Sequence, residues 1–165
     1  MIWFSFFHGG EYHPSVTELF PYFAERDSRE DILALFPIEM AFNLGLFCLD
    51  ISWYQEAIDL FNKSFAQNND PANLANIGNV YIHLSDFNKA VDYMSRAIEI
   101  TNRGFRKSKS AVALYHFDRA AAFINLKNFG PARADFNDAI RLDPSLEEEI
   151  EDIWQRYGPG DNWLK

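Results

Sequence analysis

Cysteine is nearly absent from this chain, which has 165 residues and one cysteine, Cys48. A single thiol cannot form an internal disulfide, and it cannot supply the cysteine set of a structural zinc site. The fold therefore has to rest on a hydrophobic core. A lone reduced cysteine fits a reducing compartment, so we expect a cytoplasmic protein.

Positive charge is also scarce. Fifteen lysine and arginine residues stand against 24 acidic ones, which gives a net charge of −9. A general nucleic-acid binder carries the opposite sign, so that class is disfavoured. The first basic residue is Arg26, and without a cationic start the apolar N-terminus does not read as a secretory signal.

Long hydrophobic runs are missing as well. The best membrane candidate, residues 32–49, sits at the lower edge of spanning length. It carries Glu39 and is interrupted by Pro37, Asn43 and Gly45. Pro37 more simply marks the first turn of a helix, so we expect no membrane span.

What the chain does have is a spaced pattern that occurs three times. Each copy contains a pair of adjacent residues. An alanine follows twelve residues after the second member of the pair. A large side chain comes four residues after the alanine, and a small one three residues beyond that. The pairs are Leu44-Gly45, Ile77-Gly78 and Arg119-Ala120; the alanines are Ala57, Ala90 and Ala132; the large side chains are Phe61, Met94 and Phe136; the small ones are Ser64, Ala97 and Ala139. The copies are offset by 33 and then 42 residues.

This spacing resembles the tetratricopeptide repeat (TPR), a helix–turn–helix unit of about 34 residues. The second copy matches best, and the third closes with Leu142-Asp143-Pro144. The resemblance implies an all-α fold, a TPR superhelix in which hairpins stack because none buries its apolar face alone. Small residues at the repeated positions let the two helices of a hairpin approach closely.

The resemblance divides the chain into consecutive parts. We expect an apolar N-terminal segment (1–14), an N-terminal helical cap (15–36), three repeats within 37–144 (about 37–70, 71–104 and 113–144) with an insertion near 103–112, and a capping helix with a tail (145–165). We expect helices at about 37–49, 53–68, 71–84, 87–101, 108–126, 130–142 and 146–157. Ser145 and Glu148 form a capping-box pattern at the start of the last one.

The resemblance also implies that the first helix of each repeat lines a concave groove. The predicted groove is largely apolar, with one polar handle, Asn79, and a surface of this kind suits a peptide or helix from another protein. Its predicted residues are Phe42, Leu46, Leu49, Ala75, Asn79, Ile82, Phe117, Ala121 and Ile124. We therefore expect a protein-binding adaptor or chaperone-like module, with no cofactor and no enzymatic activity.

Two groups of TPR proteins offer finer comparisons. One grips the C-terminal carboxylate of chaperones with a set of Lys and Asn side chains and an Arg. Asn79 matches that set, but Ala75 stands in place of a lysine and Asp118 in place of an asparagine. An acidic residue there repels a carboxylate, which disfavours such a ligand. The overall architecture is similar to that of bacterial secretion chaperones, without a specific motif.

The insertion between the second and third copies is basic. It contains Arg103, Arg106, Lys107 and Lys109 and no acidic residue. One interpretation is a docking patch for a phosphopeptide, an acidic protein or a lipid headgroup. The other, which we favour, is a solvated helix extension.

The N-terminal segment leaves three alternatives open. Residues 2–7 are apolar enough to be costly in water, so they pack on their own chain, form a homodimer interface or bind a partner. A self-assembling structural or regulatory subunit is thus the rival to the adaptor. An enzyme subunit is a weaker rival, because His8, Glu11 and His13 flank glycines without supporting groups, and we expect no metal there.

Overall fold

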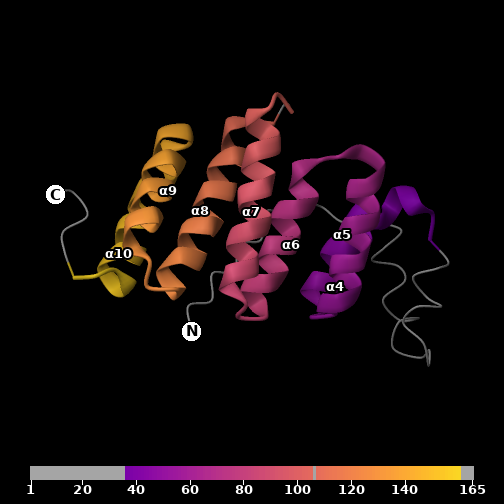
Figure 1. Ribbon diagram of the computed structural model, residues 1–165, viewed down its shortest axis with the longest axis horizontal. Helices are drawn as coiled ribbons and strands as arrows, with labels where there is room; N and C mark the ends of the chain where they lie inside the picture. Colours follow the sequence, from indigo (N-terminus) through magenta and orange to yellow (C-terminus); the bar gives the residue numbers. More distant parts are fainter. Residues whose placement is uncertain (1–35, 106, 161–165) are drawn as a thin grey trace.

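The computed structural model describes residues 36–105 and 107–160, and all regular elements in this part of the chain are helical (Figure 1). The all-α prediction is confirmed. The predicted N-terminal segment and nearly all of the predicted N-terminal cap lie outside the described residues, as do Arg106 and the last five residues.

Three helical hairpins follow one another and a single helix closes the array. The elements are η1 (Ile38–Met40), α4 (Ala41–Asp50), α5 (Tyr54–Asn68), α6 (Pro71–His83), α7 (Phe87–Asn102), α8 (Lys109–Asn125), α9 (Phe129–Leu142), η2 (Pro144–Leu146) and α10 (Glu147–Tyr157). Apart from the first, each helix begins and ends within about two residues of its predicted bounds, a spread typical of helix ends.

Local side-chain bonds explain several helix starts. The Asp70 carboxylate accepts a hydrogen bond from the Ala72 N–H, and Pro71 occupies the first turn of α6, where its missing N–H costs nothing. Asp86 caps α7 and Ser108 caps α8 in the same manner. The predicted insertion thus begins after α7 and, from Lys109 onward, forms the first turn of α8.

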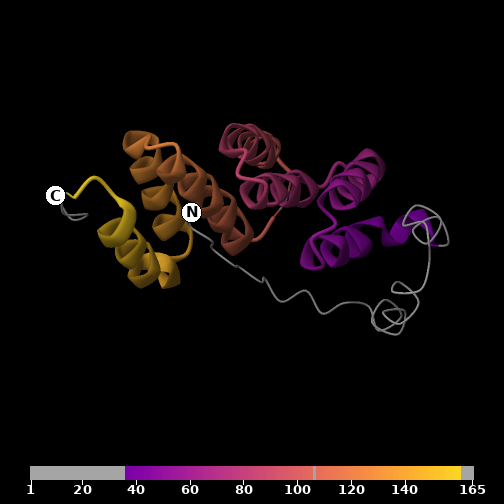
Figure 2. The same ribbon diagram turned by 90° about the horizontal axis from the view of Figure 1, so that it is seen from below.

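Neighbouring helices pack in chain order, so the molecule is a row of antiparallel helices (Figure 1). The first helices also meet across repeats, because α4 contacts α6 and α6 contacts α8. In Figure 2 α4 and α6 run along one side of the molecule and α5 and α7 along the other. The first helices of the three hairpins, α4, α6 and α8, thus form one continuous layer, which we call the inner layer.

The repeated small residues set the close approach within each hairpin. A Cβ added at Gly45 would lie 2.7 Å from the Phe61 ring, and one at Gly78 would lie 2.8 Å from Cγ of Met94. The three repeated alanines, Ala57, Ala90 and Ala132, are fully buried. The predicted close contact between the paired helices is confirmed at these positions.

The core consists of two clusters. One joins α4, α5 and α6 with parts of α7 and α8, and includes Phe47, Phe61 and Ile77. The other joins α8 and α9 to the closing helix, and includes Phe136 and Trp154. Because α10 contributes Trp154 to this second cluster, it acts as the cap that a solenoid end requires.

Two local predictions need correction. The first repeat does not begin as an α-helix at residue 37, because Ile38–Met40 form a 3-10 turn before α4. The capping box of Ser145 and Glu148 does not form either. Asp143 accepts both the backbone N–H and the hydroxyl of Ser145, which holds that residue in η2, one turn before α10.

No helix within 36–105 and 107–160 is both long enough and apolar enough to cross a membrane.

Candidate interaction surface

On the first repeat the inner layer keeps apolar side chains partly exposed. Phe42, Leu46 and Leu49 of α4 are half-buried, and each packs on the first core cluster. The Phe42 ring meets the Phe61 ring edge to face, with centroids 5.9 Å apart. These three residues therefore combine fixed positions with an apolar surface that a partner can contact.

The second repeat presents a mixed surface. Asn79 and Ile82 of α6 are half-buried, whereas Ala75 is buried and belongs to the first core cluster. Of the three residues predicted for this repeat, Asn79 and Ile82 remain available for contact, and Ala75 is assigned to packing.

In the third repeat the predicted groove residues are buried. Phe117 and Ile124 are 0% exposed and Ala121 is 2% exposed. The Phe117 ring packs against Phe136 of α9 with centroids 5.6 Å apart, and Phe117 and Ile124 share the second core cluster with Ile150 of α10. Helical spacing alone gave no sign of this burial. We correct their assignment from contact surface to packing.

A polar contact crosses the boundary between the second and third repeats. The Asn79 side chain hydrogen-bonds to the Asp118 carboxyl group, which is only 9% exposed. Burial raises the pKa of Asp118 to about 7, the bond from Asn79 opposes this rise, and the nearby Glu149 adds to it. Sequence reasoning treated Asp118 only as a mismatch, although a carboxylate on a mostly apolar helix face was the available signal.

Two further carboxyl groups, Asp50 of α4 and Glu149 of α10, have raised pKa values. Burial raises the pKa of Asp50, at the end of α4, to about 6. Burial, followed by the charge of Asp152, raises the pKa of Glu149. Partial dehydration disfavours the charged form of a carboxyl group, but Asp50 is exposed and Glu149 is half-buried, so both are less confined than Asp118.

The predicted basic patch is partly neutralised. Arg103 pairs with Glu99 at 2.6 Å, and Lys107 Nζ lies 2.7 Å from a carboxylate oxygen of Asp70. The second pair is mostly buried and ties the insertion to the cap of α6. Lys109 is exposed, and Arg106 lies outside the described residues.

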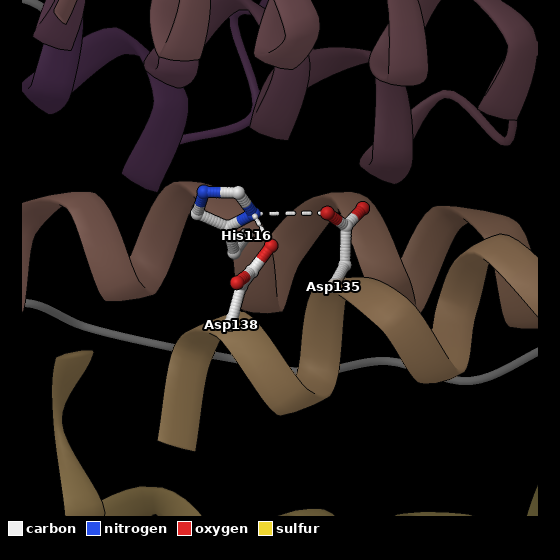
Figure 3. Close-up of side chains that lie close together, drawn as sticks. All are labelled: His116, Asp135 and Asp138. Carbon is white, nitrogen blue, oxygen red and sulfur yellow. Dashed lines mark hydrogen bonds and ion pairs between the residues drawn. The ribbon is translucent and has the colours of Figure 1, made fainter. Parts of the chain in front are cut away.

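A buried polar network joins α7, α8 and α9. Arg119 donates from Nε and Nη2 to the two oxygens of Asp135, at 2.7 and 2.6 Å, and from Nη1 to the Ser95 hydroxyl. His116 Nδ1 lies 2.9 Å from Asp135 Oδ1 and 4.0 Å from a carboxylate oxygen of Asp138 (Figure 3). Burial alone would raise the pKa of Asp135, but its bonds to Arg119 and His116 lower it below the ordinary value.

The donor atoms of His116, Asp135 and Asp138 lie within 4.8 Å of one another, which invites comparison with a metal site. However, both Asp135 oxygens already face the Arg119 guanidinium, whose charge opposes a bound cation. The arrangement suits a link between helices. Its sequence signal was Arg119 itself, which stands where the other copies have Leu44 and Ile77.

The family model of the tetratricopeptide repeat matches residues 72–103 and 113–146. This chain contains tetratricopeptide repeats. The matched segments are the second and third hairpins. The first hairpin, outside the match, packs on them in the same order.

Solved structures support this TPR fold. The N-terminal domain of stress-induced protein-1 (STI-1) from C. elegans is 17% identical, with a TM-score of 0.61 over 70% of this chain and 93% of that domain. The crystal structure of MamA is 16% identical, with a TM-score of 0.62 over 82% of this chain and 78% of that one. No curated protein matches the sequence significantly.

The side-chain amide of Asn79 is not free at the inner layer. It is engaged by Asp118 of the next repeat. The position that matched a carboxylate-gripping asparagine in the sequence thus already binds a carboxyl group of its own chain.

Proposed function

We propose that this TPR protein is an adaptor or chaperone-like module that holds a segment of another protein against its inner layer. A TPR fold supports a protein-interaction module. The observation that carries the finer proposal is the row of half-buried side chains on α4 and α6: Phe42, Leu46, Leu49, Asn79 and Ile82.

These side chains suit a peptide or helix for a physical reason. Phe42, Leu46 and Leu49 are held by packing on the core, so little rotamer freedom is lost when a partner contacts them. Asn79 and Asp118 add hydrogen-bonding groups that fix the orientation of the bound segment.

The test is affinity capture from the native cell lysate by the full chain and by a variant carrying Leu46→Ala, Asn79→Ala and Ile82→Ala. The matched control carries Leu84→Ala and Leu126→Ala, which shorten two exposed leucines at the hairpin turns. A partner lost by the first variant and kept by the control supports the proposal, provided circular dichroism shows both folded. A partner retained equally by both contradicts it.

A further inference from the structure

The described carboxylates fall into two groups. Some carboxylates are matched by cations: Asp86 with Lys89, Glu99 with Arg103, Asp138 with Arg141 and Asp152 with Arg156. Within 36–105 and 107–160, no ion pair is found for Asp50 of α4, Asp118 of α8 or Glu149 of α10. Asp59 of α5 and Asp92 of α7 also have no ion pair within the described residues, but both are exposed to water, so the missing cation matters most where the carboxylate is confined.

Asp118 is the most confined of these three. It is 9% exposed and its only hydrogen-bond partner among the described residues is Asn79. A carboxylate has about four lone-pair sites, so one amide leaves most of its accepting capacity unused. Glu149 of α10 acts on the same group and adds negative charge.

No cation of the described chain is placed to neutralise Asp118. The adjacent Arg119 is committed to Asp135 and Ser95. Lys109, at the start of the same helix, is nine residues away, which is about 13 Å along the axis. α6 carries no lysine or arginine, and its side chain at this boundary is the neutral Asn79.

We propose that the inner layer takes a partner segment in which a lysine or arginine stands among apolar residues, and that this cation pairs with Asp118. The apolar residues would contact Phe42, Leu46 and Ile82, which are half-buried on the same layer. The inference rests on the proposed function and names the chemistry of its partner. Charge complementarity carries it, because a confined carboxylate without a cation is stabilised when one arrives.

The test uses three fluorescein-labelled peptides of fifteen residues with one leucine pattern and lysine, glutamate or serine at the remaining positions. Fluorescence anisotropy with the full chain is measured at physiological salt, where attraction between distant surface charges is largely screened. We expect the lysine peptide to bind at least tenfold more tightly than the serine peptide, and the glutamate peptide more weakly than both.

The deciding variant is Asp118→Asn, which keeps the shape of the side chain and a hydrogen bond to Asn79. It should weaken the lysine peptide about tenfold, equivalent to about 1.4 kcal/mol, and leave the serine peptide unchanged. The matched control is Asp92→Asn, which removes the same formal charge from an exposed position on α7 and should change neither.

Two results would overturn the inference: equal effects of Asp118→Asn and Asp92→Asn on the lysine peptide, or a glutamate peptide that binds as well as the lysine peptide. Failure of the proposed function looks different. If Leu46→Ala and Ile82→Ala weaken all three peptides while Asp118→Asn has no selective effect, the inner layer binds and only the cation pairing is wrong. If Leu46→Ala and Ile82→Ala change no peptide's affinity, the proposed inner surface itself fails.

Discussion

At the residue scale, the turns inside the three hairpins share one backbone conformation. Ser52, Ser85 and Lys127 have φ angles of 62°, 59° and 59°, in the left-handed region. The next residue's N–H bonds back across the helix end, as Asp86 N–H does to the Tyr81 carbonyl at 2.9 Å. This is the helix ending that usually carries glycine, so each hairpin turn places a side chain where its Cβ is strained.

Replacing Lys127 by glycine should relieve that strain. Lys127 is exposed, so the substitution removes little packing. We expect Lys127→Gly to raise the free energy of unfolding by about 0.5–1 kcal/mol, the strain of a left-handed side chain less the extra flexibility of glycine when unfolded. Urea denaturation measures the change. Lys127→Ala is the control, since it keeps the Cβ. Equal stability of the two variants would contradict the strain argument.

At the element scale, the network of Ser95, His116, Arg119 and Asp135 fixes how three helices meet. Asp135 is almost fully buried, with 5% of its side chain exposed, and Arg119 supplies its nearest cation. Removing Arg119 leaves that carboxylate buried without the guanidinium. Such losses are far more costly than replacing the whole pair by apolar residues.

We therefore expect Arg119→Met to lower the free energy of unfolding by about 3 kcal/mol at neutral pH. The double variant Arg119→Met/Asp135→Leu should recover most of it, because no unpaired charge remains. The Asp135 pKa is lowered in the folded protein, so its stabilising contribution is present above the unfolded value of 3.8 and is lost as the pH falls through the folded value. Denaturation of the single and double variants at neutral pH gives the coupling. A single variant as stable as the parent would show that the network contributes nothing.

The helices were predictable from sequence because they depend on local spacing. The alanines Ala57, Ala90 and Ala132 mark where the helices of a hairpin approach, and a proline or capping residue marks several starts. The contacts across repeats were not predictable in this way. Asn79 with Asp118 and Arg119 with Asp135 join residues on different helices, and helix periodicity does not fix the register between helices.

The candidate interaction surface shows the same difference between features set by one helix and features set by packing between helices. Half-burial of Phe42, Leu46 and Leu49 followed from the face of α4 alone. Burial of Phe117 and Ile124 depends on how α9 and α10 pack around the third repeat. A repeat next to a cap therefore differs from an internal one even when its sequence pattern is the same.

At the scale of the whole molecule, a carboxyl group of the inner layer, Asp118, lowers the stability of the folded chain when it ionises. The Asp118 pKa is about 7 in the folded protein against 3.8 for the ordinary group. Between these values the folded chain holds more protons than the unfolded one, so this group lowers stability as the pH rises from about 4 to 7. The penalty is fully present above pH 7 and absent well below pH 4.

Asp118→Asn should therefore stabilise the protein in a pH-dependent manner. About three pKa units set an upper limit near 4 kcal/mol, and because the surroundings relax around a charged group we expect a gain of about 2 kcal/mol at pH 8. At pH 4 the two proteins should be nearly equal in stability.

Urea denaturation of both at the two pH values measures this, and Asp92→Asn, at an exposed site, should show no gain at either. A gain of the same size at both pH values would point to packing. A gain confined to pH 8, together with weaker binding of the lysine peptide, would mean that the free protein keeps a destabilising carboxylate which a cationic partner neutralises.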